Sequence, residues 1–136
     1  MDSIKFSCSF AEESIAYQGI LPAIRMYFST LNIKEAGLLQ VAIAEALTNA
    51  IHASKGKMVF LSMQFNPTQN LKVRIRDCGN GFDVEKELNR LAMWSLEDSE
   101  EIYSVESGRG LWIIQQVFDN IKFNSKGNEI VMVKEI

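Results

Sequence analysis

Short stretches in which hydrophobic and polar residues alternate predict five β-strands. The clearest is Leu71–Asp77, where every second residue is aliphatic and the residues between them are basic. The polar segment Pro67–Asn70 precedes it and predicts a turn that makes an antiparallel hairpin with the strand before. A turn at Gly127-Asn128 joins the last two strands in the same way. The other predicted strands are Met1–Ser9, Met58–Phe65, Ile121–Asn124 and Glu129–Lys134.

Helical spacing of hydrophobic residues separates these strands. One helix runs from Ile20 to Leu31, with Pro22 tolerated in its first turn. Asn32 followed three residues later by Glu35 is typical of a capping box, so a second helix is expected from Asn32 to about Ala53. Two more are predicted around Val84–Trp94 and from Gly108 through Phe118. Strands and helices in this order indicate an α/β fold.

Length and composition indicate one domain over residues 1–136. The chain has 136 residues, of which 47% are hydrophobic, enough for a core without disulfides. A net charge of −3 disfavours direct binding to nucleic acid, and no apolar stretch is long enough to cross a membrane. The two cysteines, Cys8 and Cys78, lack metal-binding spacing and are typical of a reducing compartment. We therefore expect a cytoplasmic protein.

Residues 82–107 form a strongly acidic segment. They include eight acidic and only two basic residues, with weak periodicity outside the helix expected around Val84–Trp94. Such a segment is typical of an exposed insertion that moves, so we expect a lid over a neighbouring site.

Three polar residues of the second helix share one face. Glu45, Asn49 and His52 stand at positions i, i+4 and i+7. A carboxylate, an amide oxygen and an imidazole on one side can serve as general base, Mg²⁺ ligand and phosphate contact. The same pattern is also that of an ordinary solvent-facing helix surface.

Two glycine-containing segments are further candidates. Asp77 ends a strand and is followed by Gly79 and Gly81, so a carboxylate that can accept a hydrogen bond from an exocyclic amine lies beside backbone that can approach a flat ligand. A plain turn is the alternative interpretation. Gly108 and Gly110 open a helix, whose first amides can bind phosphate. No Walker A motif is present.

Taken together, three motifs occur in a familiar order. They are Glu45-Ala-Leu-Thr-Asn49, Asp77-Cys-Gly-Asn-Gly-Phe-Asp83 and Gly108-Arg-Gly-Leu-Trp-Ile-Ile114. In this respect the chain resembles the GHKL ATPase superfamily, and within it the single-domain anti-sigma-factor serine/threonine kinases of bacteria. The resemblance implies the Bergerat, or histidine kinase-like ATPase, fold. This is a two-layer α/β sandwich in which helices pack on one face of a mixed β-sheet.

The resemblance also implies a role for each motif. ATP and Mg²⁺ are the implied cofactors. Asn49 would hold Mg²⁺ and contact the nucleotide, Glu45 would be the general base, and Asp77 would bind the adenine amino group. Residues 82–107 would be the ATP lid. Backbone and side chains at the nucleotide would come from Gly79, Gly81, Gly108, Arg109 and Gly110.

The implied function is that of an ATP-dependent serine/threonine protein kinase in partner switching. Such a kinase binds a sigma factor and phosphorylates a STAS-domain anti-anti-sigma protein, and homodimers are typical of the family. The alternatives are a non-catalytic, nucleotide-dependent regulator and an isolated catalytic domain of histidine-kinase type. Two positions depart from the family pattern. Ala53 stands where a basic residue is frequent, and Asn128-Glu129 stands where a threonine often begins the last strand.

Overall fold

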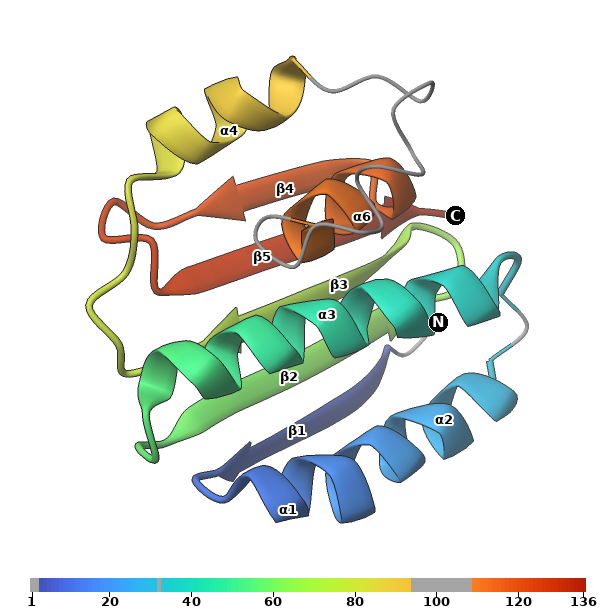
Figure 1. The fold of residues 1–136 in the computed structure, drawn as a ribbon. Helices are drawn as coiled ribbons and strands as arrows, with labels where there is room; N and C mark the ends of the chain where they lie inside the picture. The colour runs from blue at the N-terminus through green and yellow to red at the C-terminus, as the bar shows by residue number, and fades with distance from the viewer. Residues whose placement is uncertain (1–2, 32, 94–108) are drawn as a thin grey trace.

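The structure is a computed structural model and describes residues 3–31, 33–93 and 109–136. Figure 1 shows a single sheet with helices packed against it. In chain order the elements are β1 (Ile4–Phe10), α1 (Glu13–Ile15), the π-helical segment η1 (Ala16–Ile20), α2 (Leu21–Ser29), α3 (Ala36–Ser54), β2 (Val59–Asn66), β3 (Asn70–Arg76), α4 (Val84–Ala92), α6 (Arg109–Val117), β4 (Asn120–Phe123) and β5 (Glu129–Glu135).

The sheet has the strand order β1-β2-β3-β5-β4, and each of its pairings is antiparallel. The expectation of a mixed sheet is therefore wrong, although the α/β sandwich is confirmed. Between β1 and β2 the chain crosses the sheet twice as helix, first through α1 to α2 and then back through α3. The strand β2 therefore runs antiparallel to β1. The strands β3 and β4 run in the same direction but do not pair, because β5 lies between them and pairs with both.

Helices α2, α3 and α6 cover one face of the sheet (Figure 1). Alternate strand residues point toward them, because successive side chains of a strand face opposite sides. The core between the two layers is formed by Leu39, Ile43, Leu47, Leu61, Met63, Leu71, Val73, Ile75, Ile114 and Met132. On the other face of β3 lie Lys72, Arg74 and Arg76, which are exposed as the alternation predicts.

The start of α3 differs from the sequence prediction. The helix begins at Ala36, and Glu35 occupies the N-cap with a φ of 62°, without a capping hydrogen bond from its side chain. Its carboxylate instead lies 3.4 Å from Lys134 Nζ of β5. The capping box is therefore wrong, because Glu35 lies before the helix rather than in its first turn; Asn32 is outside the described residues. The C-terminal end at Ser54 is within one residue of the prediction.

Helical structure before α2 was not predicted. It begins at Glu13, and only Ala16 of the α1 and η1 residues is buried. A single buried position gives no periodic signal, which explains the omission. The π-helical segment ends just before Pro22, whose missing N–H would interrupt a regular α-helix at this point.

Helix α4 confirms the helix expected in the acidic segment. The Asp83 carboxylate caps it by accepting a hydrogen bond from Lys86 N at 3.0 Å. Trp94 and the rest of the expected lid up to residue 107 lie outside the described residues.

Candidate functional site

A cavity of about 200 Å³ lies between α3, α6, the end of β3 and the turn between β4 and β5. Its size suits one part of a ligand, since whole ligand pockets are roughly 300–1,000 Å³. Small residues at helical spacing on α3 leave room for this cavity, because their side chains do not fill it. The helical part of the lining consists of Ala46, Asn49, Ala50 and Ala53 from α3 with Leu111 and Ile114 from α6.

Asp77 forms the polar end of this cavity. It is only 9% exposed, and its Oδ1 atom accepts a hydrogen bond from Gly79 N at 2.7 Å. Among the described residues Oδ2 has no hydrogen-bond partner, so an acceptor remains for a ligand. Burial raises the pKa of the Asp77 carboxyl, while the Gly79 bond and the nearby charge of Lys126 oppose that rise.

Glycine is required at two positions after Asp77. A Cβ on Gly79 would lie 2.5 Å from the Ala53 carbonyl oxygen, and one on Gly81 would overlap the Lys126 backbone. Gly81 also has a φ of 77°, which side chains rarely adopt. Cys78 N donates to Ser54 Oγ at 3.1 Å and so ties this loop to the end of α3. The loop therefore packs directly on neighbouring backbone.

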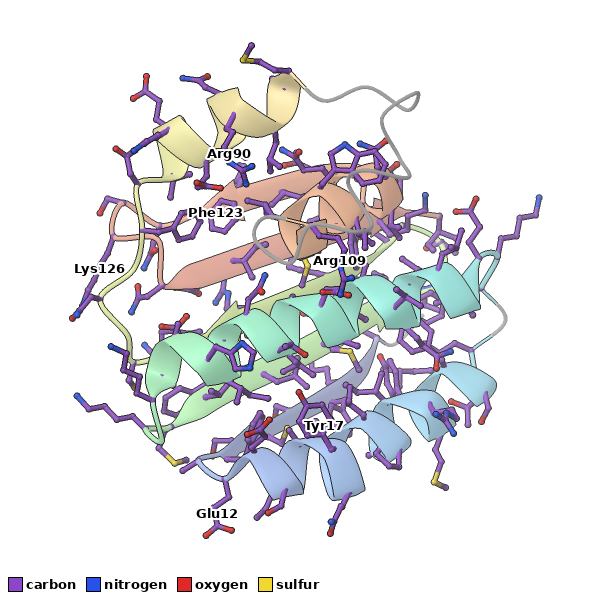
Figure 2. The ribbon with its side chains drawn as sticks, viewed as in Figure 1. Glu12, Tyr17, Arg90, Arg109, Phe123 and Lys126 are labelled. Atoms are coloured by element: carbon purple, nitrogen blue, oxygen red, sulfur yellow. The ribbon has the colours of Figure 1, made fainter. Side chains whose placement is uncertain are left out.

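A second polar cluster forms where α6 crosses α3. A Cβ on Gly110 would lie 2.8 Å from Glu45 Oε2 and 3.4 Å from Asn49 Nδ2, so glycine allows α6 to approach these side chains. Arg109 Nη2 lies 3.9 Å from Glu45 Oε1. Figure 2 shows Arg109 at the start of α6, over the middle of α3. The structure thus brings the first and third motifs together. Their order in the sequence did not reveal that they are close in space.

Two predicted site residues, His52 and Gly108, are not placed at the cavity. His52 is exposed and does not line the cavity, whereas Asn49 and Ala53 of the same helix do. The solvent-facing interpretation therefore fits His52. Gly108 lies outside the described residues.

Among the cavity residues, Phe82 and Phe123 were not predicted from the sequence, and Asn128 was noted only as a departure from the family pattern. The two phenylalanine rings meet edge to face, with centroids 5.2 Å apart and planes at 88°. Asn128 Nδ2 donates to the Asp77 carbonyl oxygen at 3.0 Å. Their positions next to the glycine loop and the last turn were visible in the sequence, but the pairing of β3 with β5 was needed to place them beside Asp77.

The arrangement suits a flat, partly apolar ligand that carries an amine. Aliphatic and aromatic side chains line most of the cavity, and Asp77 supplies an acceptor at one end. Glu45 places a carboxylate oxygen near Gly110, and Asn49 places its side-chain amide there. Mg²⁺ prefers oxygen ligands and is commonly bound through one or two protein groups plus the phosphates of a substrate, so these residues fit such an ion.

Comparison with known proteins shows the family of the chain. The model of the Histidine kinase-like ATPase domain matches residues 21–134, so the chain belongs to that family. It is 29% identical over 102 residues to the serine-protein kinase RsbW of Listeria innocua, and 30% identical over 116 residues to the serine-protein kinase RsbW of Oceanobacillus iheyensis.

These alignments cover 72% and 83% of this chain, and 64% and 71% of the respective relatives. The chain thus spans just under two thirds of the length of the Listeria relative. In the residues that the structure describes, no helix is both long and apolar enough to cross a membrane.

Proposed function

We propose that this chain is an ATP-dependent serine/threonine protein kinase that acts as an anti-sigma factor. One observation carries the proposal: among the described residues, one Asp77 oxygen has no hydrogen-bond partner at one end of the cavity, and Gly110 of α6 lies close to Glu45 and Asn49 of α3. Such an arrangement suits adenine at one end and phosphates at the other. The names of the relatives support phosphoryl transfer to serine.

The base-binding end holds adenine by one hydrogen bond and by apolar contact. Asp77 Oδ2 accepts from the exocyclic amine, while Ile114 and Phe123 contact the ring. Gly79 and Gly81 keep the loop close enough for this contact, because any side chain there would meet backbone.

The phosphate end uses the start of α6 and the polar face of α3. Backbone amides at a helix start favour anions, and Arg109 and Gly110 lie at that start, directly after Gly108 in the sequence. Asn49 is the proposed Mg²⁺ ligand. When bound, Mg²⁺ neutralises charge on the transferring phosphoryl group.

Glu45 is the proposed general base. Its carboxylate accepts the proton of a serine or threonine hydroxyl, whose oxygen bonds to the γ-phosphorus as the bond from that phosphorus to the bridging oxygen breaks, leaving ADP. Arg109 Nη2 lies 3.9 Å from the same carboxylate and so places a positive charge beside the proposed base.

Partner switching completes the proposal. The hydroxyl acceptor is a STAS-domain anti-anti-sigma protein, and its phosphorylation prevents it from displacing a bound sigma factor. Residues 82–107 act as the ATP lid, and exclusion of water by such a lid favours transfer to a protein over hydrolysis. The protein functions as a cytoplasmic homodimer.

The test is transfer of labelled γ-phosphate from ATP to purified STAS-domain proteins encoded near this gene, with the modified residue located by mass spectrometry. We expect one serine or threonine to be labelled by the wild type and not by Glu45→Gln. Nucleotide binding without any transfer would instead favour the non-catalytic regulator. Labelling of a histidine would favour a histidine-kinase-type domain.

A further inference from the structure

Two hydrogen bonds join the turn between β4 and β5 to Asp77, and a third orients the turn residue that makes them. Asp77 N donates to the Asn128 carbonyl oxygen at 2.9 Å, which extends the ladder between β3 and β5 by one residue. Asn128 Nδ2 donates back to the Asp77 carbonyl oxygen at 3.0 Å. The Asn128 amide oxygen in turn accepts from Asn124 Nδ2 at 2.6 Å.

Asn124 also holds the turn itself. Its Oδ1 atom accepts from the backbone N–H groups of Gly127, Asn128 and Glu129, at 2.8, 3.0 and 3.2 Å. One side chain therefore fixes the backbone of the turn with its oxygen and orients Asn128 with its nitrogen. Both functions of the amide are used, so no other residue type of this size can replace it.

The turn and the glycine loop are joined a second time on the far side of Asp77. Phe82 N donates to the Lys126 carbonyl oxygen at 3.2 Å, and a Cβ on Gly127 would lie 2.7 Å from the Phe82 carbonyl oxygen. Figure 2 shows Lys126 in this turn, beside the loop that follows β3. The loop is thus held by the turn at both of its ends.

These bonds leave Asp77 with one acceptor for a ligand. Its N–H, its carbonyl oxygen and Oδ1 all have protein partners, and Oδ2 has none among the described residues. Because the backbone of Asp77 is fixed on both sides, the direction of Oδ2 depends on Asn128, and through it on Asn124.

We propose that Asn124 and Asn128 are positioning residues that set the selectivity of the site for a purine with a 6-amino group. This inference rests on the proposed nucleotide site but does not require phosphoryl transfer. Neither residue needs to bind the nucleotide. They determine how accurately Oδ2 is aligned with an amine of the ligand. Their loss should therefore weaken the binding of a 6-amino purine more than the binding of a 6-oxo purine.

The experiment is calorimetric titration with ADP and IDP, whose bases differ at this group. We expect the wild type to bind ADP at least tenfold more tightly than IDP, since a site built to bond a polar group rejects an analogue without it. Asn128→Ala should weaken the affinity for ADP about tenfold, which is the effect of one lost hydrogen bond. The same change should weaken the affinity for IDP less than threefold. Asn124→Ala should act in the same direction.

Asn70→Ala is the matched control. Asn70 is the first residue of β3, at the opposite end of the strand and about 20 Å from Asp77, so its loss should leave the ADP-to-IDP ratio unchanged. If Asn128→Ala does not fold, Asn128→Ser, which keeps a shorter donor, is measured in its place and should reduce the ratio by a smaller factor.

Each outcome is decisive. A wild type that binds neither nucleotide overturns the proposed function and this inference together. A wild type that prefers ADP, with variants that weaken ADP and IDP equally, overturns the inference alone, because equal weakening is what a merely structural role produces. A reduced ADP-to-IDP ratio in the Asn128 and Asn124 variants, but not in Asn70→Ala, supports it.

Discussion

The two ends of the candidate site are built in different ways. The end at Asp77 is buried and is made of strand ends and a turn, with backbone hydrogen bonds on both sides of the aspartate. The end at Glu45 and Asn49 lies on one face of a helix, is partly exposed, and is completed by α6 pressing Gly110 against it. The first end is preformed for one shape, whereas the second leaves room for phosphates, a metal ion and a second protein.

This difference predicts a division between binding and chemistry. Changes at the Asp77 end should alter nucleotide affinity and selectivity. Changes at the α3–α6 crossing should alter the rate of transfer more than affinity for the base. The following experiments examine that division, from the largest expected effect to the smallest.

The largest effect is expected for Glu45→Gln. The amide keeps the size of the side chain but cannot accept the hydroxyl proton, so the rate of transfer to the protein substrate should fall about 10²- to 10⁴-fold. ADP affinity should change less than threefold. Single-turnover transfer and calorimetry on the same preparation measure the two quantities. Full transfer by Glu45→Gln would show that this residue is not the base.

Gly110→Ala should have the next largest effect, about tenfold or more on transfer. Its new Cβ would lie 2.8 Å from Glu45 Oε2 and would have to displace that carboxylate. Gly19→Ala is a suitable control, because nothing lies within 4 Å of a Cβ added there. Transfer that is unchanged in Gly110→Ala would mean that the contact between α6 and Glu45 does not matter for catalysis.

Removal of Mg²⁺ should affect only one end. We expect chelation with EDTA to lower the affinity for a non-hydrolysable ATP analogue about tenfold, because the ion offsets repulsion at the phosphates. Adenosine, which lacks phosphates, should bind equally with and without Mg²⁺. Competition titrations with both ligands measure this. Mg²⁺ dependence of adenosine binding would contradict the separation of the two ends.

The smallest expected effect is on stability. Burial raises the pKa of Asp77, so its ionised form destabilises the folded state. That cost appears as the pH rises from the ordinary value of 3.8 through the raised pKa and is complete above it. Without nucleotide, Asp77→Asn should therefore raise the Tm by up to about 3 °C at neutral pH.

The pH dependence supplies the control for that prediction. Near pH 3 both proteins carry a neutral side chain at position 77, so their Tm values should converge. A Tm for Asp77→Asn that is several degrees lower at neutral pH would indicate that the carboxylate stabilises the fold, contrary to its burial.

The sequence predicted most strands and the later helices, because alternation and helical spacing report which side of each element is buried. It failed at Asn32–Glu35, where a capping pattern was overridden by a left-handed Glu35 and its ion pair with Lys134. The mixed sheet implied by the family resemblance was also wrong, because every pairing in the five-stranded sheet is antiparallel.

For the site, the sequence predicted residues but not their neighbours. Glu45, Asn49 and Gly110 could be proposed from their motifs, yet their contact depends on how α6 crosses α3. Asn124 was predicted only as the end of a strand. Asn128 was predicted as a turn residue and noted as a departure from the family pattern, but an asparagine in a turn is common whatever it bonds. Their role emerges only from the register of β3 with β5.

The most direct test of the central claim is a calorimetric titration of ADP, in the presence of Mg²⁺, into the wild type and into Asp77→Asn. We expect the wild type to bind one ADP per chain, and the variant to remain folded with affinity reduced about 100-fold or more. Equal affinity in the two proteins would contradict the assignment of Asp77 as the base-binding residue, and no binding by either would contradict the nucleotide site as a whole.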